Sequence, residues 1–172
     1  LTVQAITLPP DAPPLFDSLK NLNWEKGSFN NPFAIYQRTY LARTENLISN
    51  LFMDYQLMTG LHIKSNFGYT NIKLHETSLD PVTSFNPAYG YTSGYAFFAD
   101  NTAQTWVIEP QLEYSFQAKK NRLSILAGAS FQNSLNQGKG FVATGFTSDL
   151  LLSDIGAATS IRQQGNVYAL YR

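Results

Sequence analysis

The sequence has no cysteine, little charge and no long apolar run, and each shortage excludes a class of protein. Without cysteine, the 172 residues hold no disulfide, no thiolate zinc ligand and no cysteine nucleophile. Only 14% of residues are charged, against about 25% in an average soluble domain. Twelve basic and twelve acidic residues leave no net charge, so the basic excess of a nucleic-acid-binding protein is missing. No run of about eighteen apolar residues predicts a transmembrane helix.

What the sequence does contain is four segments, each of about ten to thirteen residues, in which apolar and polar side chains alternate. Successive side chains of a β-strand point to opposite faces, so this period indicates strands with one apolar and one polar face. About nine to eleven tilted residues cross a bilayer, so each segment is long enough to do so. The apolar positions are Leu47, Leu51, Met53, Tyr55, Leu57, Leu61, Ile63, Phe67, Tyr69, Trp106, Ile108, Leu112, Tyr114, Phe116, Leu123, Ile125, Ala127, Ala129 and Phe131.

The connections between these segments alternate between short and long. Short turns are expected at Met58–Gly60, where Gly60 can supply a positive φ, and at 118–121. Outer-membrane barrels have short periplasmic turns and long extracellular loops. The two short turns are therefore expected on the periplasmic side and the long loops on the extracellular side. The expected division is 1–45 for an irregular extracellular loop and strand approach, 46–70 for the first hairpin, 71–104 for a long loop, 105–132 for the second hairpin, 133–166 for another long loop, and 167–172 for the start of a next strand.

The fold class expected from these patterns is all-β, with antiparallel up-and-down strands that form part of a large transmembrane β-barrel. Five strands are too few to close a barrel, because the smallest membrane barrels have about eight. The chain also begins without the charged and apolar regions of a signal peptide. We therefore expect the sequence to be a fragment of a longer exported protein.

An ordered series of short stretches resembles SusC/RagA-like TonB-linked outer-membrane proteins, in the middle portion of their β-barrel. The similarity covers nearly the whole chain, and it depends on the order of the stretches because no single one is decisive. The stretches are LPPDAPP at 8–14, LNW at 22–24, NPFA at 31–34, NLISN at 46–50, GLHIKSNFGY at 60–69, WVIEPQLEY at 106–114, LAGASFQ at 126–132, GFTSDLL at 145–151 and IGAA at 155–158.

The resemblance implies a TonB-dependent transporter in the outer membrane of Bacteroidota, with a barrel of about 22 strands and a plugged lumen. Such proteins import oligosaccharides or peptides, each with a SusD-like surface lipoprotein as a lid and with energy from the TonB complex. The expected partners are therefore outer-membrane lipid, that lipoprotein and the ligand, with no nucleic acid. The plug domain and the TonB-binding segment are expected outside this sequence, so TonB would be engaged through regions not in this chain.

The candidate ligand-binding residues are aromatic side chains of the expected loop at 71–104, namely Tyr89, Tyr91, Tyr95, Phe97 and Phe98. Sugars stack on flat apolar rings, and tyrosine adds a hydroxyl group for hydrogen bonding. The alternative is that these rings pack the loop onto its neighbours or onto the lid lipoprotein. The same two interpretations apply to Trp24, Phe33 and Tyr36.

Two features of the segment at 105–117 carry structural expectations. Trp106 and Tyr114 lie on its apolar face, where they are expected in the aromatic belts at the membrane interfaces or against a neighbouring strand. Pro110 lacks a backbone donor, so a bulge or local break is expected there.

No catalytic, metal or cofactor site is expected, and the protein is not expected to be an enzyme. Glu109 and Glu113 lie four residues apart on one strand face, so their Cα atoms are about 13 Å apart, too far for an acid/base pair. His62 and His75 are the only histidines, and no cysteine or carboxylate cluster joins them. Asp54, Lys64 and the other polar-face residues are expected to form a solvated wall.

A soluble or cell-surface β-sandwich that binds carbohydrate through its loops is the alternative function. The two hypotheses differ in where the apolar strand faces go. In a sandwich these faces meet in a dry core, whereas in a barrel they form an outer band that faces lipid.

Overall fold

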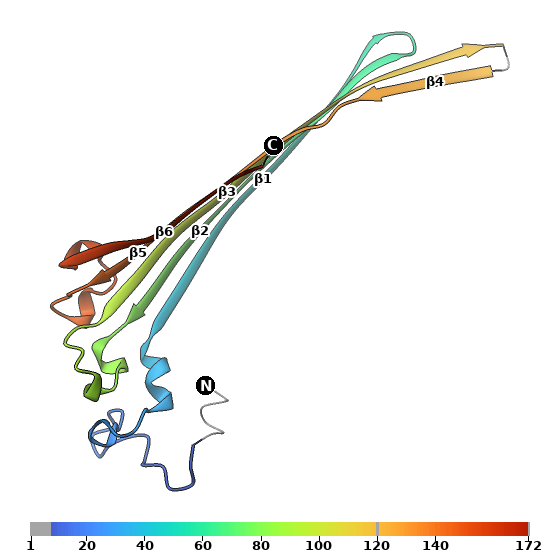
Figure 1. Ribbon diagram of the computed structural model, residues 1–172. Coiled ribbons are helices and arrows are strands. Elements are labelled where there is room, and N and C mark those ends of the chain that lie inside the picture. The colour runs from blue at the N-terminus through green and yellow to red at the C-terminus, as the bar shows by residue number, and fades with distance from the viewer. Residues whose placement is uncertain (1–7, 120, 172) are drawn as a thin grey trace. The chain divides into compact units, whose positions relative to one another are not determined.

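The computed structural model describes residues 8–119 and 121–171, and within them the chain forms one antiparallel sheet of six strands (Figure 1). The predicted all-β class is confirmed. Neighbouring strands follow the order β1-β2-β3-β5-β6, and β4 pairs with β3 beside this path, so the sheet is built by up-and-down connections. A membrane-crossing helix is not found among the described residues. The strands are β1 (Thr39–Met58), β2 (Leu61–Asp80), β3 (Tyr95–Ala118), β4 (Asn121–Gly128), β5 (Phe131–Thr144) and β6 (Ser160–Tyr171).

Short 3-10 helices lie in the segments that precede or connect the strands. Most of these helices are three residues long, and the longest has six residues. They are η1 (Glu25–Gly27), η2 (Pro32–Gln37), η3 (Val82–Ser84), η4 (Pro87–Tyr89), η5 (Asp149–Leu151) and η6 (Ile155–Ala157).

The strands extend well beyond the alternating segments, which corrects the predicted loop boundaries. The expected loop at 71–104 is strand up to Asp80 and again from Tyr95, and β1 starts at Thr39 inside the expected irregular region. The expected loop at 133–166 contains most of β5 and the start of β6. In these stretches the two faces no longer differ: 95–99 has apolar side chains on both, and 131–144 has polar side chains on both, so the two-residue period is lost. Hydrogen bonds to neighbouring strands, which no local pattern records, maintain the strand there.

The first hairpin turns through Thr59 and Gly60, and the predicted positive φ of Gly60 is confirmed at 84°. The backbone N–H of Ser115 on β3 donates to the Gly60 carbonyl at 2.7 Å. A Cβ atom at Gly60 would lie 2.2 Å from the Ser115 carbonyl oxygen. Glycine is therefore required at this turn both by its backbone conformation and by the close approach of the neighbouring strand. In the second hairpin Ala118 pairs with Asn121.

Pro110 does not interrupt its own strand, contrary to the prediction, since β3 runs unbroken from Tyr95 to Ala118. The interruption lies in the opposite chain, where Ala129 and Ser130 separate β4 from β5. The Ala129 N–H donates to the Pro110 carbonyl at 3.0 Å. In an antiparallel sheet the N–H and C=O groups of one residue point to the same neighbouring strand. The N–H group that proline lacks would therefore point to Ala129 and Ser130, where the neighbouring chain is not in a strand.

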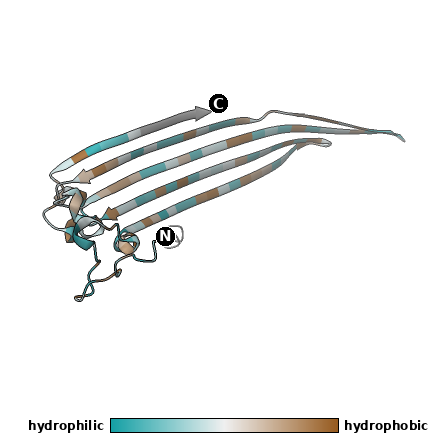
Figure 2. Ribbon diagram, turned by 60° about the horizontal axis from the view of Figure 1, so that its bottom comes forward, coloured by the Kyte–Doolittle hydropathy of each residue, from teal (hydrophilic) through white to brown (hydrophobic). Residues whose placement is uncertain are grey.

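The register between β3 and β4 places their predicted apolar residues on one face. Leu112 pairs with Ala127, Tyr114 with Ile125, and Phe116 with Leu123. Directly paired residues of antiparallel strands point to the same side, so these six side chains form one apolar patch. Apolar and polar residues can be followed along the strands in Figure 2.

Contacts divide the chain into two compact units. The first contains the residues up to Arg43, His75–Ala99 and Lys139–Gly165, and the second contains Thr44–Leu74, Asp100–Gly138 and the residues from Asn166. In the first unit Ala96, Ala143, Phe146 and Leu152 form a small buried core, against which Leu79, Phe98 and Ile155 pack.

Candidate ligand-binding site

Two Asn-Pro pairs shape the first unit around a candidate site. Asn31 precedes η2 and Asn86 precedes η4, and each is followed by proline at the first helical position. The residue before proline favours an extended backbone, and proline itself is pre-set for helical φ. Each asparagine side-chain oxygen accepts a backbone N–H two residues later, from Phe33 and Ala88, at 2.9 Å. Both asparagines therefore cap the short helix that they introduce.

The amide nitrogens of the same two asparagines donate to oxygen atoms elsewhere in the first unit, and that of Asn86 reaches a segment distant in sequence. Both side chains are buried, each with 4% of its surface exposed. Asn31 Nδ2 donates to the carbonyls of Leu15 and, at 3.0 Å, of Asn23. Asn86 Nδ2 donates to the Gly27 carbonyl at 2.9 Å and to Asn30 Oδ1 at 2.9 Å. Buried polar groups are costly unless paired. The Asn31 bonds therefore fix the segment before β1 internally, and the Asn86 bonds hold that segment against the loop after β2.

Aromatic rings gather around Phe85, a residue that the sequence did not single out. Its ring centroid lies 4.8 Å from that of Tyr91 and 5.6 Å from that of Tyr95, which it stacks on. Tyr89 meets Tyr91 edge-on at 6.4 Å. The Arg38 guanidinium carbon lies 5.2 Å from the Phe85 ring centroid, a cation–π distance.

The charge of Arg38 is compensated within this cluster. Its Nε lies 2.9 Å from Asp80 Oδ1, and Asp80 is buried. Arg38 Nε also donates to Ser84 Oγ at 3.3 Å. Burial raises the pKa of Tyr95, the negative charge of Asp80 raises it further, and the positive charge of Arg38 opposes both effects. Tyr95 is therefore held as a neutral hydroxyl group over the physiological range.

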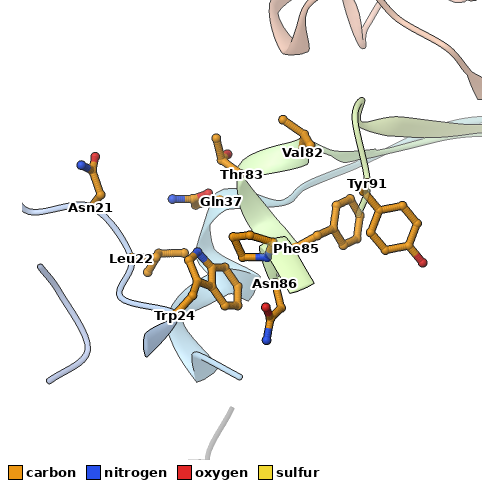
Figure 3. A pocket seen from close by; sticks show the side chains of 10 residues that line it. Asn21, Leu22, Trp24, Gln37, Val82, Thr83, Phe85, Asn86 and Tyr91 are labelled. Carbon is orange, nitrogen blue, oxygen red and sulfur yellow. The ribbon is translucent and has the colours of Figure 1, made fainter. Parts of the chain in front are cut away.

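Two adjoining cavities lie between the segment before β1 and the loop after β2, and Figure 3 shows the residues that line the larger one. The larger has a volume of about 370 Å³ and the smaller about 290 Å³. Trp24, Phe85 and Asn86 line both of them. The larger cavity is lined in addition by Asn21, Leu22, Gln37, Val82, Thr83, Pro87 and Tyr91.

The structure brings three of the five predicted ligand-binding residues together and leaves two elsewhere. Tyr91 lines the larger cavity, Tyr89 lines the smaller one, and Tyr95 stacks on Phe85. Phe97 instead lies against Gly140, where a Cβ atom would come within 3.1 Å of its ring. Phe98 packs against the small core.

Of the aromatic residues before β1, only Trp24 lines the cavities. Phe33 contacts Phe16 at 5.6 Å and Tyr36 at 5.4 Å between ring centroids, and these three line neither cavity.

The two Asn-Pro pairs were visible in the sequence as turn signals. Their buried amide bonds, which place Trp24 near Phe85, had no sequence signal of their own.

The polar strand face in the second unit carries a separate network. Lys64 Nζ lies 2.6 Å from Glu113 Oε2 and 3.8 Å from Asp54 Oδ2. His62 Nδ1 lies 2.9 Å from Asp54 Oδ1. Asn66 Nδ2 donates to Glu109 Oε2 at 3.2 Å, so Glu109 and Glu113 have different partners and do not converge on a common point. Among the residues that the structure describes, no group of three His, Cys, Asp or Glu side chains is arranged to hold a metal ion.

Fold and site together define an all-β protein, built on one antiparallel sheet, with an aromatic and amide-lined cavity beside its strand ends. No model of a known protein family matches the chain, and no curated protein matches it significantly.

Proposed function

We propose that the chain is a barrel-wall and loop segment of a TonB-dependent outer-membrane importer of oligosaccharides or peptides, which works with a SusD-like surface lipoprotein. The observation that supports this best is the open apolar face of the strands. Leu51 is 63% exposed, Ile125 53% and Leu112 44%, although all three belong to the face that a soluble protein would bury. Burial of apolar surface contributes about 25 cal/mol per Å², so this face needs an apolar environment.

Strand length supports the same proposal. β1 and β2 have 20 residues each and β3 has 24, whereas about nine to eleven residues cross a bilayer. Strands of this length cross the membrane and continue beyond it. The cavity-bearing loops would then lie on the extracellular side, and the short turn at Thr59 and Gly60 on the periplasmic side.

The two strand faces have the chemistry that a barrel wall requires. Lys64, Glu113 and Asp54 form ion pairs on the polar face, which suits a water-filled lumen. Trp106 and Tyr114 are partly exposed on the apolar face, where they would supply aromatic belts at the two interfaces. The segment would thus contribute wall and loops to the transporter, while energy coupling through TonB would depend on other regions.

Fractionation of the source cells tests this proposal. An antibody raised against residues 80–100 is used to probe soluble, inner-membrane and outer-membrane fractions, with and without heating in detergent. A band that is found in the outer membrane and changes mobility on heating is the expected result, and co-purification of a surface lipoprotein would extend it. A soluble band without heat modifiability would refute the importer and favour the carbohydrate-binding β-sandwich.

A further inference from the structure

We propose that the larger cavity binds a short, uncharged saccharide, which stacks on its aromatic rings and forms hydrogen bonds with its amide and hydroxyl side chains. This inference rests on the proposed function for the origin of the ligand, and it deepens that function because it selects oligosaccharides over peptides. Its basis is the combination of side chains that the tertiary structure brings to one cavity (Figure 3).

Flat apolar surface is the first element of that combination. Trp24, Phe85 and Tyr91 line the cavity, and the Phe85 and Tyr91 rings are held 4.8 Å apart. The C–H faces of a pyranose ring are apolar and pack against such rings, while its hydroxyl groups point outward from the edge. Asn86, whose amide is already hydrogen-bonded to Gly27 and Asn30, fixes the loop that carries two of these rings.

The second element is polar groups that both donate and accept. Asn21, Gln37 and Thr83 line the same cavity, and their side chains are exposed. An amide side chain offers a carbonyl acceptor and two N–H donors, and a hydroxyl group offers both roles in one atom. Adjacent sugar hydroxyl groups need this mixture, because each also donates and accepts.

The third element is the lack of charge. None of the ten residues that line the larger cavity is Asp, Glu, Lys, Arg or His. Arg38 lines only the smaller cavity, and its charge is compensated by Asp80 at 2.9 Å. A peptide terminus or a uronic acid would lose hydration on entry without gaining an opposite charge, which disfavours both. A volume of about 370 Å³ lies at the lower end of the range for small-molecule sites, about 300–1,000 Å³, and suits a short saccharide.

The two tryptophans of the chain allow the site to be located directly. Trp24 lines the cavity, whereas Trp106 lies on β3 in the other unit. The full chain is purified in detergent as wild type, Trp106→Phe and Trp24→Phe. Each form is titrated with neutral hexose and pentose oligosaccharides, uronic-acid oligosaccharides and tri- to hexapeptides while tryptophan emission is recorded.

The expected result is a saturable emission change with at least one neutral oligosaccharide in the wild type and in Trp106→Phe, and none in Trp24→Phe. Calorimetry then compares Tyr91→Ala with Tyr36→Ala, a tyrosine that lines neither cavity. Tyr91→Ala should weaken saccharide binding about tenfold, and Tyr36→Ala should leave it unchanged.

Three results would overturn the inference: no response to any neutral oligosaccharide, preferential binding of peptides or uronic acids, or a response that survives in Trp24→Phe. These are distinct from failure of the importer proposal. Outer-membrane fractionation without saccharide binding removes only the ligand assignment, and saccharide binding by a soluble protein removes only the importer.

Discussion

Replacement of Leu112 by arginine is the most direct test of which strand face meets lipid. Leu112 lies on β3, pairs with Ala127, and shares its face with Tyr114 and Ile125. Arginine near the midplane of a bilayer on the lipid face of a barrel costs about 2–4 kcal/mol. Since about 1.4 kcal/mol corresponds to a factor of ten, the folding equilibrium should shift by roughly 30- to 700-fold.

Gln111→Arg is the matched control, because it introduces the same side chain one position away on the opposite face. Gln111 is exposed and pairs with Gly128, which has no side chain to obstruct a longer neighbour. We expect this variant to change stability by less than about 0.5 kcal/mol, as for most surface substitutions.

The assay is a denaturant titration of the protein folded in phospholipid vesicles, followed by the heat-modifiable band. The titration is repeated in aqueous buffer without lipid. A penalty at Leu112 that requires lipid supports a lipid-facing position. Equal costs for the two variants would refute the face assignment, and an equal Leu112 penalty without lipid would show that this face packs in a protein core.

Three further predictions concern the turn, the buried amide and the clustered tyrosine. Gly60→Ala should destabilise the fold by about 1–3 kcal/mol in a denaturant titration, because the alanine would have a positive φ and its Cβ atom would clash with Ser115. Gly90→Ala should destabilise the fold less, because φ is positive there too but no atom lies within 4 Å of the added Cβ atom. Asn86→Asp removes the amide donors, so limited proteolysis should cut near Gly27 faster than in the wild type, and an unchanged rate would contradict the anchoring role. The pKa of Tyr95 is raised in the folded protein, so the folded protein holds the phenol proton more tightly than the unfolded chain does. The contribution of Tyr95 to folding stability is therefore fully present below about pH 10 and is lost as pH rises through the folded-state pKa. Phenolate absorbance should show Tyr95 ionising at lower pH in Asp80→Asn, and no change would contradict the role of that charge.

The central part of the sheet could be predicted from the sequence because its signal is local. Along Leu123 to Ala127 and Leu112 to Phe116 every second side chain is apolar, and this period belongs to a strand wherever its partners lie. The turn at Gly60 was predictable for the same reason, since positive φ and a two-residue connection are properties of adjacent residues.

The strand ends and β5 could not be predicted in the same way. From Phe131 to Thr144 the chain has two glycines and polar residues on both faces, and its strand conformation depends on pairing with β3 and β6. Gly138 is so close to Asn101 that a Cβ atom would lie 2.3 Å from its side-chain oxygen. Such proximity between residues 37 positions apart leaves no mark on either local segment.

By itself, the sequence determined that this protein is a sheet of two-faced strands with short glycine-containing turns, because alternation and backbone preference act over a few residues. It also indicated that tyrosines near residue 90 belong to a candidate site. Only the tertiary structure decided that Tyr91 and Tyr95 contact Phe85 while Phe98 joins the core. The tertiary structure also placed Trp24 in the lining of one cavity with Tyr91 and of the other with Tyr89. That decision depends on buried amide hydrogen bonds between segments more than fifty residues apart, such as Asn86 to Gly27, which form only when the chain has folded.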